Sequence, residues 1–408
     1  MLRPAAEGGP AWNLATSYPD RIVLTWSGDP TTTQSVTWRT DTTVAVGVVQ
    51  YAIASPGPGF GVLAVTDTAT TERVDARAIE DAGVVVNFHS VVLSGLVPDT
   101  LYAYRVGDGT DWTEWFHFQA SREPKPFSFI YFGDAQNDIL SLWSRTIRSS
   151  FAEAPDARFM IHAGDLIDNA HNDLQWGEWF RAGGWIHAMM PSIPAAGNHE
   201  YDPFNAEDEA KDIDHLSVFW RPQFTLPLNG VKGQEESNYY IDYQGTRILV
   251  LNSNEQREDQ AAWLEKVLAD NPQPWTIATF HHPTFSTGQE RDNPVLRGLW
   301  KPLFDRYGVD LWCFRATITP TGVAEPSPPH RIRSPASTPV TTRPAPSSWS
   351  PSAAARCTIS RRASGVPTRP SSKGRRNTRS CSRSSASSAT RSATRHIRRS
   401  AACTMRST

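Results

Sequence analysis

Four short segments of the chain carry side chains that are good ligands for metal ions. Each follows a run of apolar residues and supplies carboxylate, amide or imidazole groups: Gly133-Asp134-Ala135-Gln136, Gly164-Asp165-Leu166-Ile167-Asp168, Gly197-Asn198-His199-Glu200 and His281-His282-Pro283. This mixture of oxygen and nitrogen ligands suits metals such as zinc, iron or manganese. A carboxylate that bridges two such cations can hold them about 3.5–4 Å apart. Because a single Gly-Asp pair is typical of an ordinary turn, only the set of four indicates a metal centre.

The elements that precede these segments predict an α/β domain over residues 126–312. Buried-strand runs alternate there with helical patterns of about 10–15 residues. The predicted strands are 127–132, 159–161, 239–243, 247–251, 276–280 and 309–312, and the predicted helices are 139–152, 175–190, 258–270 and 295–307. Ligand groups in such folds gather at the carboxyl ends of the strands, so we expect the four segments to meet there.

Residues 18–120 are predicted to form an all-β module. Short β-branched or aromatic runs at 22–26, 34–39, 46–51 and 89–93 are separated by Gly, Pro, Asp and Ser, as in a β-sandwich. Residues 93–107, where a Leu and Pro turn precedes a Tyr-x-Tyr strand, resemble the corner between strands E and F of fibronectin type III domains. A generic β-sandwich is the alternative. A polar linker, residues 121–126, follows the module.

The charge of the chain is unevenly distributed. Of its 40 basic and 42 acidic residues, 18 basic residues and one acidic residue follow Trp312, which leaves 22 basic and 41 acidic residues before that point. Such an acidic body does not suit specific nucleic-acid binding. All four cysteines lie after Trp312, so we expect no disulfides in the body. We also expect no membrane span, and residues 1–20 have no apolar run typical of a secretory signal.

Taken in order, the four segments resemble the calcineurin-like metallophosphoesterase superfamily, and the β module in front of them resembles its purple acid phosphatase branch. This resemblance covers residues 18–312. It implies a fibronectin type III-like domain at 18–120 and a metallophosphoesterase domain at 126–312, in which two β-sheets are flanked by helices. The implied activity is that of an acid phosphatase-like phosphoesterase, in which a metal-bound hydroxide at a dinuclear centre attacks a phosphate ester.

The resemblance also implies roles for single residues. Asp134 would bind the first metal, Asp165 would bridge both metals, and Asn198 and His281 would bind the second. His199 matches a histidine that assists the transition state or the leaving group, with a capping contact as the alternative. His282 lies outside the ligand positions, where an outer-shell or packing role is expected. The two metals would be iron, zinc or manganese.

Two positions depart from the resemblance. Asp168 stands where purple enzymes have a tyrosine, so we expect no iron-to-tyrosine colour. Gln136 stands where many members have a histidine, and its amide could bind a metal weakly or donate a hydrogen bond from outside the first shell. The acidic segment 201–214 is expected to be a solvated loop, with a lid over the site as the alternative.

The Gly-His-x-His loop that closes the site in this superfamily is missing after the predicted strand 309–312. Residues 313–408 are instead rich in Ser, Arg, Pro, Thr and Ala, which predicts a disordered tail. Codon degeneracy offers an explanation. If Phe314 ends in C and residues 315–322 are encoded AGG GCC ACG ATC ACG CCT ACG GGN, reading one base earlier gives Gln-Gly-His-Asp-His-Ala-Tyr-Gly. We therefore interpret the tail as a frameshift product, with a true basic tail as the alternative.

These features leave three hypotheses about function. The first is a phosphoesterase that acts on small or polymeric phosphate esters. The second is a catalytically impaired protein of the same fold, which binds metal or phosphate but lacks the two histidines of the missing loop. The third is that the sandwich supplies adhesion to a polymer or cell surface. The resemblance suggests a secreted or periplasmic protein, although the sequence shows no signal peptide.

Overall fold

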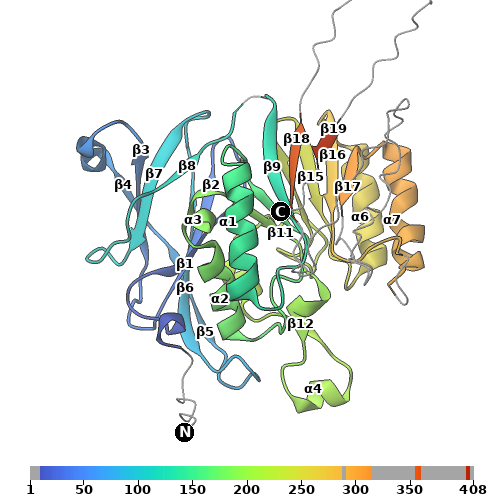
Figure 1. Ribbon diagram of the computed structural model, residues 1–408, viewed down its shortest axis with the longest axis horizontal. Coiled ribbons are helices and arrows are strands. Elements are labelled where there is room, and N and C mark those ends of the chain that lie inside the picture. Colours follow the sequence, from blue (N-terminus) through green and yellow to red (C-terminus); the bar gives the residue numbers. More distant parts are fainter. Residues whose placement is uncertain (1–9, 123, 287–290, 314–353, 360–400, 405–408) are drawn as a thin grey trace, which may run out of the picture.

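The N-terminal part of the protein is a sandwich of two antiparallel sheets, shown in blue to cyan in Figure 1. The computed structural model describes residues 10–122, 124–286, 291–313, 354–359 and 401–404. One sheet has the order β1 (Asp20–Thr25), β2 (Gln34–Thr40), β6 (Val85–Leu93), β5 (Thr70–Asp75), and the other has the order β4 (Val65–Thr68), β3 (Val48–Ile53), β7 (Leu101–Gly107), β8 (Phe116–Gln119). Buried Trp38, Tyr104 and Phe118 pack between the sheets. The predicted sandwich is therefore confirmed.

A tyrosine fixes one corner of this sandwich. The backbone N–H of Val97 donates to the hydroxyl of Tyr102 at 2.9 Å, which is the contact that defines a tyrosine corner. Strands β4 and β5 were not predicted from the sequence. Their residues are mostly Thr, Asp and Glu on exposed surfaces, so they show none of the apolar alternation that marks a half-buried strand.

Two further sheets form the core of the α/β part. The first has the order β11 (Ser192–Pro194), β10 (Met160–His162), β9 (Phe127–Phe132), β18 (Ala354–Ile359), β19 (Ala401–Thr404). The second has the order β14 (Tyr239–Tyr243), β15 (Thr246–Val250), β16 (Trp275–Thr279), β17 (Leu311–Cys313). Strands β9, β10 and β11 are parallel to one another, and so are β15, β16 and β17, which brings their carboxyl ends to one edge of each sheet.

Alternating side chains of the second sheet face different layers. Ile248 and Val250 of β15 join the core shared with the first sheet, while Leu249 packs with helices α6 (Arg257–Ala269) and α7 (Pro294–Tyr307). Helices α1 (Ser144–Glu153) and α2 (Asp173–Gly183) add Ile147 and Trp176 to the shared core. The four layers of helix, sheet, sheet and helix confirm the predicted α/β architecture (Figure 1). Because both faces of these strands are buried, most of their residues are apolar, although β15 begins with Thr246 and Arg247.

Two of the predicted helices are interrupted. The pattern at 139–152 forms a π-helical turn, Ile139–Trp143, followed by α1. The predicted helix 175–190 is wrong as one element, because it divides into α2 and α3 (Trp185–Met189). Gly184 between them has a φ of 52° and a ψ of −130°, a conformation outside the helical region that glycine adopts readily. Other short elements of the described chain are three 3₁₀ turns, Ala11–Asn13, Pro58–Leu63 and Asn198–Glu200, and helix α5, Trp220–Gln223.

The sandwich and the α/β part also share a hydrophobic cluster, to which Trp26 of the sandwich and Phe159 and Tyr243 of the α/β part belong. Trp26 lies 5.9 Å from Phe159 and 5.2 Å from Tyr243, measured between ring centroids. The hydroxyl of Tyr104 donates to the carbonyl of Ala188 at 2.6 Å. The sandwich therefore packs directly on the part of the protein that carries the predicted metal ligands.

The structure describes only part of the predicted disordered tail. Strand β18 pairs antiparallel with β9, and β19 pairs antiparallel with β18. The edge of β9 that faces away from β10 supplies the backbone groups to which β18 bonds. Residues 314–353, 360–400 and 405–408 lie outside the described residues. Within the described chain, no helix is both long and apolar enough to cross a bilayer.

Candidate metal centre

Asp134, Asp165 and His281 come together at the carboxyl ends of three strands. They follow β9 and β10 in the first sheet and β16 in the second. All three residues are buried, and one ligand atom of each lies within 4.8 Å of the ligand atoms of the other two. The structure therefore groups three of the four residues predicted from the sequence to bind metal.

The imidazole of His281 is oriented toward oxygen atoms. Its Nδ1 lies 2.9 Å from the carbonyl oxygen of Ala163, which can only accept, so Nδ1–H is the donor. In the neutral ring, Nε2 then carries a lone pair. This atom lies 3.1 Å from Asp165 Oδ2 and 3.1 Å from Asn198 Oδ1, the fourth predicted ligand. Three acceptors that face one point require a cation between them, either a proton or a metal ion.

Two glycines allow these loops to approach so closely. A Cβ atom on Gly197 would lie 2.2 Å from Asp165 Oδ1, and a Cβ on Gly164 would lie 2.6 Å from the backbone nitrogen of Gly197. Gly164 also has a φ of 89°, a conformation that side chains rarely adopt. Asp165 follows it with a φ of 52°, so the backbone is sharply turned where its carboxylate enters the group.

His199 lies beside the ligand group and is partly exposed. Its backbone N–H donates to Asp165 Oδ1 at 3.1 Å. Its ring Nδ1–H donates to the carbonyl of Asp168 at 2.7 Å, and Asp168 Oδ1 lies 3.5 Å from the same nitrogen. Because Nδ1 is engaged, Nε2 is the ring nitrogen available to a substrate.

The remaining candidate residues take different positions. Gln136 is buried and its Nε2 donates to Asp165 Oδ2 at 3.2 Å. The carboxylate of Asp168 is 41% exposed and is next to His199 rather than inside the ligand group. His282 turns toward the loop after β15, where its Nδ1 lies 2.8 Å from the hydroxyl oxygen of Ser253.

Sequence reasoning missed the contribution of Glu200. Its buried carboxylate accepts hydrogen bonds from the backbone N–H groups of Asp165, Leu166 and Gly197, at 2.8, 2.7 and 2.6 Å. It therefore ties together the two loops that carry Asp165 and Asn198. Burial, followed by the nearby Asp165 carboxylate, raises the pKa of Glu200 to about 7. The position of Glu200 directly after Asn198-His199 could have marked it as part of the site. Its hydrogen bonds, however, are made to the loop of Asp165, which lies 35 residues earlier in the chain.

Replacing Glu200 with glutamine should weaken both the fold and the metal site. The glutamine amide cannot accept at both of its ends, so at least one buried backbone N–H loses its partner, at a cost of about 1–3 kcal/mol in the free energy of unfolding. Urea unfolding and metal analysis of the same samples would measure this. The control is Glu207→Gln, whose side chain is 76% exposed. Equal stability of the two variants would contradict the role of Glu200.

The segment after Glu200 is more ordered than the predicted solvated loop. Short strands β12 (Tyr201–Asp202) and β13 (His215–Leu216) pair, and helix α4 (Ala206–Ala210) lies between them. The rings of Phe204 and His215 stack with centroids 4.0 Å apart. In Figure 1 the segment from β12 to β13 protrudes from the rest of the protein, at the end opposite β18.

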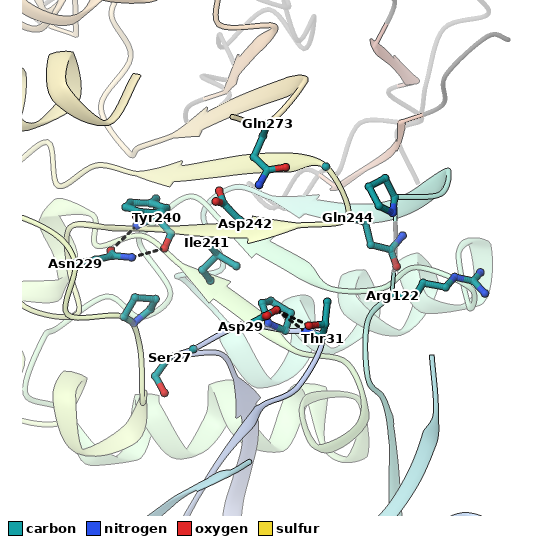
Figure 2. Close-up of a pocket in the computed structure, with 15 residues that line it drawn as sticks. Ser27, Asp29, Thr31, Arg122, Asn229, Tyr240, Ile241, Asp242, Gln244 and Gln273 are labelled. Atoms are coloured by element: carbon teal, nitrogen blue, oxygen red, sulfur yellow. Dashed lines mark hydrogen bonds between the residues drawn. The ribbon is translucent and has the colours of Figure 1, made fainter. Parts of the chain in front are cut away.

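A separate hollow of about 500 Å³ lies between residues of the sandwich and of the second sheet (Figure 2). Several of its polar side chains already have partners in the protein. The side-chain amide of Asn229 donates to the carbonyl of Tyr240 and accepts from its N–H, and Asp242 forms an ion pair with Arg247 at 2.8 Å. None of the grouped ligands Asp134, Asp165 and His281 lines it, so this hollow is not the candidate centre.

Comparisons with known proteins agree with this arrangement. Residues 19–120 match the purple acid phosphatase N-terminal domain, and residues 127–314 match the calcineurin-like phosphoesterases. An uncharacterized protein of Mycobacterium tuberculosis is 27% identical over 71% of this chain and 59% of its own length. Human acid phosphatase type 7 is 25% identical over 72% of this chain and 68% of its own length. The chain thus spans about 59% of the mycobacterial relative.

Solved structures show the same fold. Purple acid phosphatase PPD1 from yellow lupin seeds superposes with a TM-score of 0.60 at 21% identity, covering 73% of this chain and 58% of the lupin chain. The structure of PhoD superposes with a TM-score of 0.51 at 11% identity, covering 73% of this chain and 71% of that one.

Proposed function

Because the chain belongs to the purple acid phosphatase branch of the calcineurin-like phosphoesterases, we propose that it hydrolyses phosphate esters with the help of bound metal ions. The observation that carries this proposal is the convergence of acceptor atoms from Asp165, Asn198 and His281 at one point beside Asp134. A cation is needed there, and the group lies next to a partly exposed histidine.

The residues present fit a dinuclear centre of iron, zinc or manganese. Asp134 would hold one metal, Asp165 would bridge, and Asn198 and His281 would hold the other. Gln136 Oε1 is a further candidate ligand, because it is buried and has no hydrogen-bond partner among the described residues. Bound metals would neutralise phosphoryl oxygens and lower the pKa of water.

The protein's own groups would orient the reactants. Asp165 is held in place by the backbone N–H of His199 and the side-chain amide of Gln136. The Nε2 atom of His199 would carry the proton that the leaving oxygen takes up. Since Nδ1–H is bound to the Asp168 carbonyl, the ring presents Nε2 in a fixed direction.

The missing Gly-His-x-His loop bears on the second hypothesis, a protein that binds metal or phosphate with little turnover. Strand β17 is parallel to β16, and Cys313 pairs with Thr279, two residues before His281. A loop that follows β17 would therefore start at the same sheet edge as His281. This supports the proposal that the sequence after Trp312 has lost the reading frame of such a loop.

Turnover of a panel of phosphate monoesters and diesters, with metal counted on the same samples, tests the proposed function. We expect hydrolysis that depends on added metal and is lost with a chelator. Metal binding without turnover would support the impaired protein instead. Hydrolysis that is unchanged by chelation would contradict a metal-dependent mechanism.

Replacing His199 with alanine should lower turnover and leave the bound metal unchanged. General acid catalysis typically contributes about 10²- to 10⁴-fold, and we expect a loss in this range on an alkyl phosphate, whose poor leaving group needs the proton. Steady-state kinetics and metal analysis of the variant would measure both effects. Loss of metal from His199→Ala would instead show that this residue is a metal ligand.

A further inference from the structure

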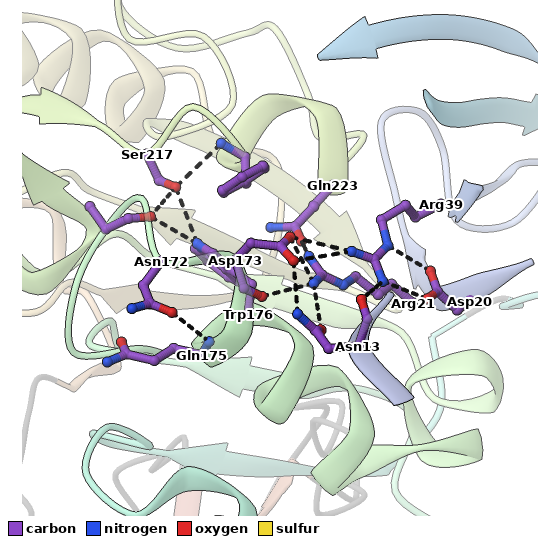
Figure 3. A network of polar contacts seen from close by, with 12 residues as sticks. Asn13, Asp20, Arg21, Arg39, Asn172, Asp173, Gln175, Trp176, Ser217 and Gln223 are labelled. Atoms are coloured by element: carbon purple, nitrogen blue, oxygen red, sulfur yellow. Dashed lines mark hydrogen bonds and ion pairs between the residues drawn. The ribbon is translucent and has the colours of Figure 1, made fainter. Parts of the chain in front are cut away.

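A buried network of charges joins the sandwich to helix α2 (Figure 3). Arg21 of β1 and Arg39 of β2 both reach Asp173, the first residue of α2, with nitrogen–oxygen distances of 2.8 and 3.3 Å. The three side chains are at most 5% exposed. Asn13 adds a hydrogen bond to Asp173 Oδ2 at 2.9 Å. Because an unpaired buried charge is strongly unfavourable, these contacts fix the first turn of α2 against the sandwich.

The same turn of α2 holds the loop that follows Asp165. Gln175 Oε1 accepts hydrogen bonds from the backbone N–H groups of Asp168 and Asn169, at 2.9 and 2.8 Å. Its Nε2 donates to Asn169 Oδ1 at 2.9 Å. Trp176 Nε1 donates to the carbonyl of Ala170, also at 2.9 Å. Two side chains of the helix therefore bind three consecutive residues of the loop.

This loop is also the partner of His199, because the carbonyl of Asp168 accepts the Nδ1–H of its ring. We propose that Gln175 is a positioning residue for His199: by holding the backbone at Asp168, it keeps the ring turned so that Nε2 meets the leaving group. The Asp173 network, in turn, holds the helix that carries Gln175. The inference rests on the proposed function, in which His199 supplies the proton.

A residue that positions His199 and a residue that only stabilises the fold affect different substrates. Esters with a poor leaving group, such as a simple alkyl phosphate, need a proton at the leaving oxygen as the bond breaks. An ester with a good leaving group, such as 4-nitrophenyl phosphate, depends much less on this proton. A change that only reduces the amount of folded protein lowers both rates by the same factor.

Two substitutions separate these cases. Gln175→Met has a similar length, but it donates no hydrogen bond and its sulfur is only a weak acceptor, whereas Gln175→Glu keeps the oxygen that both backbone N–H groups need. For Gln175→Met we expect kcat on the alkyl ester to fall by about 10- to 100-fold, as for a misplaced catalytic group, and kcat on the aryl ester to fall by less than about threefold, with metal content unchanged. Gln175→Glu should restore most of the loss. Gln119→Met, in strand β8, is the matched control and should leave both rates unchanged.

Two measurements do not depend on turnover. Hydrogen exchange at the amides of Asp168 and Asn169 should become faster in Gln175→Met but not in Gln175→Glu. The nitrogen chemical shifts of the His199 ring report whether Nδ1 carries the proton that is donated to Asp168. We expect them to show that this form is no longer fixed in Gln175→Met, and that it is kept in Gln175→Glu.

Equal losses on both esters, or an unchanged ring form with faster amide exchange, would overturn the inference. If the unmodified protein hydrolyses neither ester, the proposed function fails. The ring form in the two Gln175 variants then still decides whether Gln175 orients His199.

Discussion

Alanine in place of Asp165 should leave the protein with little bound metal and no measurable phosphoesterase activity. Asp165 has no exposed surface, and Oδ2 lies 3.1 Å from the Nε2 atom of His281 while Oδ1 accepts the N–H of His199. Loss of an outer partner of a metal site costs about 10- to 100-fold in metal affinity, and we expect loss of the bridging carboxylate to cost more. Metal analysis after dialysis and turnover of an aryl phosphate would measure both effects.

Asp168→Ala is the matched control for this experiment. The Asp168 carboxylate is 41% exposed and lies on the same loop, three residues later, but outside the ligand group. We expect the Asp168 variant to keep its metal. If Asp165→Ala and the unmodified protein bind the same amount of metal, Asp165 is not the bridging ligand.

Restoring one base near the codon of Trp312 should give a large gain in metal occupancy and phosphoesterase activity. The restored sequence would place a Gly-His-Asp-His loop directly after β17, at the sheet edge that carries His281. Two added imidazoles would complete the ligand set of a dinuclear centre. Bound metal also stabilises the folded state, by about 2.7 kcal/mol when the free metal is 100 times the Kd.

The control for the restored protein is the same frame with both loop histidines replaced by alanine. Activity, metal content and thermal unfolding would be compared among the three proteins. We expect the double alanine variant to fall back to the level of the unrestored chain. A restored protein with no more metal or activity than this chain would show that the interpretation of the tail as a frameshift product is wrong.

The sequence predicted the elements whose burial pattern is simple. Strands such as β9 and β15 are buried on both faces and therefore carry mostly apolar residues in an unbroken run, Phe129–Phe132 and Ile248–Val250, which separates them from the amphipathic helices around them. Strands β4 and β5 escaped prediction because they lie on the surface and carry mainly Thr and acidic residues. The break between α2 and α3 depends on the positive φ of Gly184, and helical periodicity does not show it.

For the site, the sequence indicated which side chains gather but not how they are held. Asp134, Asp165 and His281 were predictable as a group because each follows a predicted strand, and ligand groups gather at the carboxyl ends of strands in such folds. The three backbone contacts of Glu200 and the two of Gln175 join loops that are distant or separated by a turn. Such contacts depend on the backbone path, and residue type alone does not reveal them.

A metal titration of the metal-free protein tests the proposed centre most directly. Zinc or manganese would be added stepwise, and bound metal and hydrolysis of 4-nitrophenyl phosphate would be measured on the same samples, with Asp165→Ala and His281→Ala alongside. We expect metal to bind tightly to the unmodified protein and weakly to both variants, and any turnover to rise with the metal bound. Equal binding to all three proteins, or turnover without bound metal, would contradict a catalytic metal centre at Asp134, Asp165, Asn198 and His281.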